Sequence, residues 1–268
     1  MGPGRDVSLH HWPEAAELGA SIAVTTRHGG VSLSPYASLN LGLHVGDVPD
    51  RVIANRERAA RAFGVDLGAL VFAQQVHGAG VTVVGAADRG RGSHRLDEAA
   101  AAATDILVTT EAATVMVILV ADCAPIALID PEARVMAAVH AGWRGTAAGA
   151  VGRALDAMAK LGSRNDRVVA FIGPAVDPGR YQVDEAVRRA LTEATAPHAL
   201  HPDVARPDGP EHWLVDLVAA NRQQLHLAGV PPAQIIDGGT STSDDDFFSD
   251  RAARPCGRFA LMAQLLAS

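Results

Sequence analysis

The stretch Val115–Val139 constrains the fold more than any other part of the sequence. It contains three short apolar runs that we interpret as buried strands, at Val115–Val120, Ala124–Ile129 and Val135–Val139. The two connections between these runs have only three and five residues, so neither has room for a crossover helix. Part of the sheet structure must therefore be antiparallel, which disfavours a regular doubly wound parallel fold.

The rest of the chain alternates irregularly between strand and helix patterns. Apolar runs predict further strands at Ile22–Thr26, Leu70–Gln75, Val81–Val84 and Val168–Ile172. Apolar positions spaced by three and four predict helices at Val52–Phe63, Thr146–Leu161, Asp184–Ala194 and Leu214–Ala228, and a further short helix at Phe259–Leu266. We therefore expect an α+β fold, a mixed sandwich with helices outside the sheets. Because no repeat or long linker divides the chain, residues 1–268 are expected to form a single domain.

Charge and hydropathy exclude several classes of function. The formal net charge is −7, which argues against a protein that binds nucleic acid by neutralising phosphates. The longest apolar stretch, Val115–Ile129, is too short for a membrane span and is broken by Asp122 and Pro125. Two cysteines cannot form a disulfide framework, and Met1–Trp12 lacks the apolar core of a signal peptide. We expect a cytoplasmic protein, and a monomer is compatible with the sequence.

Three residues with metal-ligand chemistry, His77, Cys123 and His140, each follow a predicted buried strand. Strand ends in a sandwich can converge on one spot. Two imidazole nitrogens and one thiolate sulfur suit Zn²⁺, and three protein ligands leave a fourth position open, as in catalytic zinc sites. Taken singly, a buried Cys is more often a small apolar residue and a His at a strand end is more often a satisfied polar contact.

Eight sequence blocks, spread in order over nearly the whole chain, resemble the laccase-domain family, also called the multicopper polyphenol oxidase-like or YfiH-like family. The blocks are TTRHGGVS at Thr25–Ser32, SLNLGLHVGD at Ser38–Asp47, NRERAARAFG at Asn55–Gly64, QQVHG at Gln74–Gly78, ADCAPI at Ala121–Ile126, HAGWRGT at His140–Thr146, GPAVDPGRYQV at Gly173–Val183 and DDFFSDR at Asp245–Arg251. The family's metal ligands fall in three of these blocks and correspond to His77, Cys123 and His140.

The resemblance implies a four-layer α/β/β/α sandwich and a zinc-dependent purine nucleoside phosphorylase. Such an enzyme cleaves adenosine, inosine or methylthioadenosine with phosphate, and has adenosine deamination as a side activity. The partners implied are a purine nucleoside and phosphate. The chain also departs from the family pattern: FFSYRR reads FFSDRA at Phe247–Ala252, so contacts from the family's tyrosine and second arginine do not carry over.

Two other classes of function stay open. The family's name suggests a copper-dependent polyphenol oxidoreductase, but multicopper oxidases hold several coppers with many histidines, usually in His-x-His pairs. This chain has 11 histidines and no such pair. The other class is a non-catalytic metal-binding protein or one that edits peptidoglycan precursors, as suggested for some bacterial relatives.

Phosphorolysis also needs an anion pocket beside the nucleoside, and arginines are the natural phosphate ligands. Our candidates are Arg27, in a glycine-rich turn, and Arg144, four residues after His140. Asp122 is either a partner that orients a metal-bound imidazole or a turn residue. Asn40 and Gln74 are candidates for contacts with the purine edge, and the alternative for both is a role in bracing loops.

Overall fold

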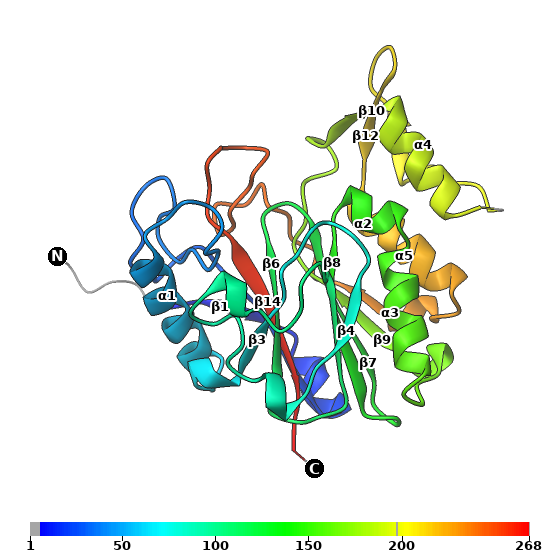
Figure 1. Ribbon diagram of the computed structural model, residues 1–268. Helices are drawn as coiled ribbons and strands as arrows, with labels where there is room; N and C mark the ends of the chain where they lie inside the picture. The colour runs from blue at the N-terminus through cyan, green and yellow to red at the C-terminus, as the bar shows by residue number, and fades with distance from the viewer. Residues whose placement is uncertain (1–5, 197, 268) are drawn as a thin grey trace.

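Two β-sheets packed face to face form the centre of the protein (Figure 1), for which a computed structural model describes residues 6–196 and 198–267. The five-stranded sheet has the order β1 (Leu9–His11), β2 (Ala20–Thr25), β14 (Phe259–Leu265), β6 (Val115–Val120) and β3 (Leu70–Phe72). The six-stranded sheet has the order β13 (Ile235–Asp237), β9 (Val169–Ile172), β7 (Ala124–Asp130), β8 (Val135–Ala141), β5 (Ile106–Thr109) and β4 (Val81–Val83). Each sheet contains parallel and antiparallel pairs.

Helices cover the outer face of each sheet and complete four layers. α1 (Pro49–Ala62) packs on the five-stranded sheet, and α3 (Ala150–Ala159) and α5 (Leu217–Leu227) pack on the six-stranded sheet. A separate apolar cluster fills the space between the two sheets. β6, β7, β8 and β14 are buried along their whole length because they are covered on both faces, which explains their continuous apolar sequences. The α+β class and the α/β/β/α sandwich are confirmed.

A smaller unit extends one edge of the sandwich. Its three strands have the order β10 (Gln182–Asp184), β12 (His212–Val215) and β11 (Ala205–Pro207), and α4 (Glu185–Ala194) packs beside them. The Asp184 carboxylate accepts a hydrogen bond from the Val187 N–H and so caps the start of α4. Val183, Val187 and Leu217 belong to a fourth apolar cluster under this unit.

The short connection after β6 carries the chain from one sheet to the other. β6 pairs with β14 and β3 in the five-stranded sheet, whereas β7 pairs with β8 and β9 in the six-stranded sheet. The antiparallel pairing expected in this region occurs between β7 and β8, where Ala124 faces Ala141. Cys123 therefore lies at the point where the chain passes between the two sheets.

Two predicted elements differ from the structure. Phe259–Leu266 was expected to be a helix, but this prediction is wrong because β14 is the central strand of its sheet, between β2 and β6. Every residue of β14 is buried, so its sequence carries no two-residue alternation that would have indicated a strand. The expected helix Thr146–Leu161 is two helices, α2 (Trp143–Ala147) and α3.

The seven strands predicted from apolar runs are confirmed as β2, β3, β4, β6, β7, β8 and β9. The strands that sequence reasoning missed, apart from β14, have only three or four residues each, namely β1, β5, β10, β11, β12 and β13. In the part of the chain that the structure describes, no helix has the length and hydropathy needed to cross a membrane.

Candidate metal centre

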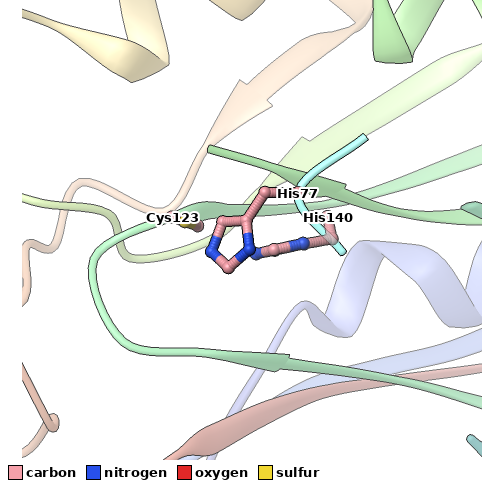
Figure 2. A group of neighbouring side chains, drawn as sticks. All are labelled: His77, Cys123 and His140. Carbon is pink, nitrogen blue, oxygen red and sulfur yellow. The ribbon is translucent and has the colours of Figure 1, made fainter. Parts of the chain in front are cut away.

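His77, Cys123 and His140 meet where the ends of the two sheets lie next to each other. His77 lies in the loop between β3 and β4, Cys123 directly precedes β7, and His140 belongs to β8. Their potential ligand atoms all lie within 4.8 Å of one another. Figure 2 shows the two imidazole rings beside the Cys123 sulfur, and the ring centroids of His77 and His140 are 4.8 Å apart. The structure thus brings together the three residues that the sequence singled out.

The backbone takes an uncommon conformation at two positions of this group. His77 has φ 61° and Asp122, next to Cys123, has φ 88°, both in the left-handed region that non-glycine residues seldom adopt. The N–H groups of Val76, His77 and Gly78 all donate to the carboxylate of Asp105, and this holds the His77 loop in place. Such strained conformations persist where the surrounding contacts determine them, and they concentrate at functional sites.

Asp105 also fixes the orientation of His140. Its Oδ1 accepts a hydrogen bond of 2.8 Å from Nδ1 of His140, and both side chains are almost completely buried. Burial alone would raise the pKa of Asp105, but hydrogen bonds from His140 and from backbone N–H groups outweigh it and lower the pKa below 3.8. An ionised Asp105 accepts only, so Nδ1 carries the proton and Nε2 is left for a metal.

The electrostatics of the group favour a thiolate. Burial alone would raise the pKa of Cys123, but His140 and His77 outweigh it and lower the pKa to about 6. Burial alone would lower the pKa of His140, but the Cys123 thiolate and Asp105 outweigh it and raise the pKa to about 9. A thiolate is the form of cysteine that binds a metal. A metal cation bound to both side chains would replace the His140 proton and balance the negative charge of the Cys123 thiolate in the same way.

The space around the three side chains fits a metal ion. A Cβ atom added to Gly142 would lie 2.6 Å from the Cys123 sulfur and 3.5 Å from Cδ2 of His77. The contact with the sulfur would be a clash, whereas the contact with the His77 ring is an ordinary one, so glycine is needed here to leave room for the Cys123 side chain. The donor set of two nitrogens and one sulfur, together with this close approach, fits zinc.

The three residues line a pocket of about 680 Å³, which is within the usual size range of small-molecule sites. One part of its wall is apolar and aromatic and contains Trp143, Val176, Tyr181, Val187 and Leu217. Burial, and then the negative charge of Cys123, raises the pKa of Tyr181 to about 12, so its phenol stays protonated at neutral pH. The pocket is large enough to hold an organic ligand beside the candidate metal site.

Another part of the pocket wall is positively charged. It contains His44, Arg254 and Arg258, which come from two loops far apart in the sequence. Partial burial, followed by the charges of Arg258 and Arg56 and then His77 and His140, lowers the pKa of His44 to about 4. His44 is therefore neutral at neutral pH, and the positive charge of this wall comes from its arginines.

Three of the other residues singled out by sequence, Gln74, Asp122 and Arg144, line this pocket. The guanidinium of Arg144 lies 4.3 Å from the centroid of the Trp143 ring. Asp122 does not orient an imidazole, because its carboxylate accepts hydrogen bonds from the Thr242 hydroxyl and the Arg251 N–H. It joins the C-terminal loop to the Cys123 turn, and Asp105 orients His140 instead.

Arg27 and Asn40 do not line the pocket. The Arg27 guanidinium donates to the Ala37 carbonyl and stacks on the Phe248 ring at 4.7 Å. Asn40 is fully buried, and its Oδ1 accepts from the N–H groups of Gly42 and Arg258. Of the two roles considered for Asn40, the structure favours loop bracing, and Arg27 has a similar bracing role.

Sequence reasoning missed Asp105, Tyr181 and the positive wall. Asp105 directly precedes the fully buried strand β5. An acidic residue next to such an apolar run is a sequence signal that could have identified Asp105 as a functional candidate. His77 lies 28 residues and His140 lies 35 residues from Asp105 in the sequence, so no local motif contains Asp105 together with either partner. His44 lies in one of the recognised sequence blocks, but nothing in that block indicated a pocket.

The fold and the site define a class of protein, a four-layer α/β/β/α sandwich with a His-Cys-His candidate metal centre in a small-molecule pocket. The chain belongs to the laccase-domain family, whose model, described as "Multi-copper polyphenol oxidoreductase laccase", matches residues 21–266.

Relatives within this family are similar over most of their length. A Geobacillus stearothermophilus protein named purine nucleoside phosphorylase YlmD is 40% identical over 243 residues, which cover 88% of this chain and 86% of that protein. A Corynebacterium glutamicum protein, also named purine nucleoside phosphorylase, is 39% identical over 238 residues and covers 88% of this chain and 90% of its own length.

Solved structures agree with this assignment. The crystal structure of the Bacillus licheniformis hypothetical protein YfiH superposes with a TM-score of 0.92 at 33% identity, covering 99% of this chain and 100% of that one. The crystal structure of YlmD from Geobacillus stearothermophilus also gives 0.92, at 36% identity, covering 100% of this chain and 98% of that one.

Proposed function

We propose that this chain is a zinc-dependent purine nucleoside phosphorylase. It converts adenosine or inosine and phosphate to the free base and ribose 1-phosphate, and methylthioadenosine and phosphate to adenine and 5-methylthioribose 1-phosphate. The observation that carries the proposal is the meeting of His77, Cys123 and His140 within 4.8 Å on the wall of a pocket of about 680 Å³. The names of the relatives support the reaction class. Adenosine deamination is proposed as a side activity of the same pocket.

His77, Cys123 and His140 are the proposed zinc ligands. Zinc bound there would supply a positive charge that polarises a substrate atom held beside it. Asp105 keeps the Nε2 atom of His140 directed to the site through its hydrogen bond to Nδ1. His140 belongs to β8, Cys123 directly precedes β7, and Asp105 holds the His77 loop, so the positions of the three side chains are set before a metal or substrate binds.

The walls of the pocket suggest roles for individual side chains. The apolar and aromatic part, with Trp143 and Tyr181, would hold the purine base away from water. The Tyr181 phenol would donate a hydrogen bond to the nucleoside, and the Arg144 guanidinium, which lies over the Trp143 ring, is a further donor at this part of the wall. Gln74, exposed on the pocket wall, is the remaining candidate for a contact with the purine edge.

A copper-dependent oxidoreductase is the alternative that the family description suggests. Within residues 6–196 and 198–267, one His-Cys-His group meets the geometric conditions for a metal site. A single group of three ligands suits one metal ion and leaves no place among these residues for the several coppers of a laccase. Copper in place of zinc remains an alternative for this single site, and metal analysis of the purified protein distinguishes the two.

We also propose a cytoplasmic location. Both cysteines, Cys123 and Cys256, are free thiols. A thiolate ligand such as Cys123 needs a reducing compartment to stay available for a metal.

The test is chromatography of inosine incubated with the zinc-loaded protein, with and without phosphate. We expect hypoxanthine only when phosphate is present, and its loss in Cys123→Ala and His77→Ala. His226→Ala removes an exposed histidine on α5 and is the matched control, expected to retain full activity. Inosine that survives in every tube would overturn the purine assignment and favour peptidoglycan editing or oxidation. Conversion of adenosine to inosine in the same assay measures deamination.

A further inference from the structure

We propose that the positive wall of the pocket, formed by Arg254, Arg258 and His44 with Asp250 between the arginines, is the binding subsite for the oxyanion co-substrate, orthophosphate. The inference rests on the proposed function, because it assigns one of the two substrates of that reaction to a part of the pocket. It places this subsite away from Arg27, whose guanidinium is already bound to Ala37 and Phe248.

Two arginines of this wall share a single carboxylate. Arg254 pairs with Asp250 at 2.6 Å and Arg258 faces the other oxygen of Asp250 at 3.5 Å. Two guanidinium groups and one carboxylate leave a net charge of +1 at the pocket surface. A bound oxyanion would take the place of, or share donors with, the Asp250 carboxylate.

Arg258 has donors available for a ligand. Its Nη1 binds Cys256 and the Gly257 carbonyl, whereas Nε makes no hydrogen bond within the described residues. The side chain is 21% exposed, so its guanidinium is held in place but open on one side. Nη2 faces Asp250 at 3.5 Å, so Nε and Nη2 together would bind a phosphate in a bidentate manner once the phosphate displaces that carboxylate.

The position of Arg258 beside His44 is fixed by close packing. A Cβ atom on Gly42 would lie 2.9 Å from Cγ of Arg258 and 3.4 Å from Cε1 of His44, so both side chains pack against this glycine. Asn40 accepts from the N–H groups of Gly42 and Arg258, which joins the two loops. The subsite is therefore built from two segments that buried hydrogen bonds hold together.

A buried charge behind the wall adds to its positive potential. Arg56 is 1% exposed and donates only to the carbonyls of Leu41, Gly92 and Ser93, with its guanidinium 3.9 Å from the Phe72 ring. No carboxylate pairs with it within the described residues. Its charge lies close enough to affect His44 and attracts an anion to this end of the pocket.

The test measures phosphate binding and turnover in the zinc-loaded protein. Arg254→Gln and Arg258→Gln are expected to raise the Kd for inorganic phosphate, measured by calorimetry, and the KM for phosphate by about tenfold or more. The KM for inosine is expected to stay within about twofold of the wild type, since the base and ribose make no use of these donors. Arg164→Gln changes an exposed arginine far from the pocket and is the matched control.

Asp250→Asn gives a readout of opposite sign. Removing the competing carboxylate is expected to lower the Kd for phosphate several-fold, a gain that structural damage would not produce. If Arg258→Gln fails to fold, Arg254→Gln still tests the subsite. The Arg254 side chain is 75% exposed, and among the described residues its ion pair and hydrogen bond are both with Asp250.

The outcomes separate the subsite from the proposed function. Phosphate binding that weakens in the arginine variants without nucleoside cleavage would support the subsite and reject the phosphorylase. Nucleoside cleavage with an unchanged phosphate KM in all variants would support the phosphorylase and overturn the subsite. A wild-type protein that does not bind phosphate would also overturn the subsite.

Discussion

Asp105 and His140 form a buried pair in which Oδ1 of the carboxylate lies 2.8 Å from Nδ1 of the ring. The same carboxylate accepts the N–H of His77 at 2.9 Å. One buried side chain thus sets the position of two of the three proposed metal ligands. This relationship makes Asp105 the positioning residue of the site.

Replacing Asp105 is expected to weaken zinc binding. Asp105→Asn would lose the charged acceptor of His140, and zinc affinity should fall by about 10- to 100-fold, as measured by competition with a chromophoric chelator. Asp156→Asn is the control, because Asp156 is an exposed residue of α3 that does not line the pocket. Equal zinc affinities of the two variants would contradict the role of Asp105.

Adding a methyl group to Gly142 is expected to close the metal site. The new Cβ would lie 2.6 Å from the Cys123 sulfur, so Gly142→Ala should lose most of its zinc, measured as metal per chain after gel filtration. Its φ of −76° is accessible to alanine, so the effect would not come from backbone strain. Gly152→Ala, which has open space around its Cβ, should keep full metal content. Full occupancy in Gly142→Ala would show that the ion lies elsewhere.

The reactivity of Cys123 in metal-free protein should report its lowered pKa. Because the thiolate forms above a pKa of about 6, alkylation by iodoacetamide should reach half its maximal rate near that pH and decline below it. The pKa of Cys256 is raised by burial, so its alkylation should be negligible at pH 7. Stoichiometric zinc should protect Cys123. A reaction profile with a midpoint near pH 9 would contradict the thiolate in the site.

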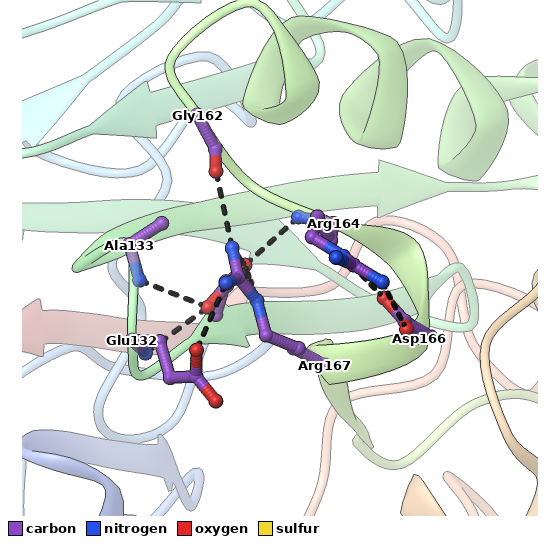
Figure 3. Close-up of polar contacts among 7 residues, drawn as sticks. Glu132, Ala133, Gly162, Arg164, Asp166 and Arg167 are labelled. Atoms are coloured by element: carbon purple, nitrogen blue, oxygen red, sulfur yellow. Dashed lines mark hydrogen bonds and ion pairs between the residues drawn. The ribbon is translucent and has the colours of Figure 1, made fainter.

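The end of β7 carries an ion pair between the buried Asp130 carboxylate and the partly exposed Arg167 guanidinium, and this pair should make stability sensitive to acid. Asp130 is fully buried and accepts hydrogen bonds from the N–H groups of Ala133 and Arg164 and from the Arg167 guanidinium, whose neighbours are shown in Figure 3. Asp130→Asn leaves Arg167 with the exposed Glu132 as its remaining charged partner and removes the buried charge that accepts its hydrogen bonds. The free energy of unfolding should fall by about 2 kcal/mol in urea titrations at pH 7. The exposed pair of Arg164 and Asp166 supplies the control, since Asp166→Asn should leave the unfolding curve nearly unchanged.

The pH dependence of that effect follows from the pKa of Asp130. Burial would raise this pKa, but the N–H groups of Ala133 and Arg164 and the Arg167 guanidinium outweigh it, so the folded-state pKa lies below the ordinary 3.8. The stabilisation is therefore complete above pH 3.8 and is lost as the pH falls through the folded-state pKa. The wild-type protein and Asp130→Asn should converge in stability in this acid range. A difference that persists there would contradict the assignment.

The sequence predicted the strands that position the site because these strands are long, continuous apolar runs. β6, β7 and β8 were found for this reason, together with Cys123 after β6 and His140 near the end of β8. The same property concealed β14, since a run that is buried on both faces lacks the alternation of a half-exposed strand. Sequence spacing also could not show that β6 and β7 belong to different sheets.

Residues that act through long-range contacts could not be predicted from local patterns. Asp105 acts through backbone N–H groups and a ring that the fold brings to it, and Arg258 reaches His44 only because Asn40 joins two loops 218 residues apart. Arg27, in contrast, had the composition of an anion-binding turn, but its guanidinium binds the Ala37 carbonyl within the same loop. Residue type identified the candidate metal and anion ligands. Only the tertiary structure distinguishes a side chain that can bind a ligand from one that stabilises a loop by hydrogen bonds.

The central claim is that phosphate itself cleaves the glycosidic bond in a zinc-dependent pocket. The most direct measurement is ³¹P NMR of the zinc-loaded protein with inosine and inorganic phosphate, with hypoxanthine quantified in the same samples. We predict one ribose 1-phosphate for each hypoxanthine released, and neither product in Cys123→Ala. Hypoxanthine accompanied by free ribose, or inosine that remains intact, would contradict the account.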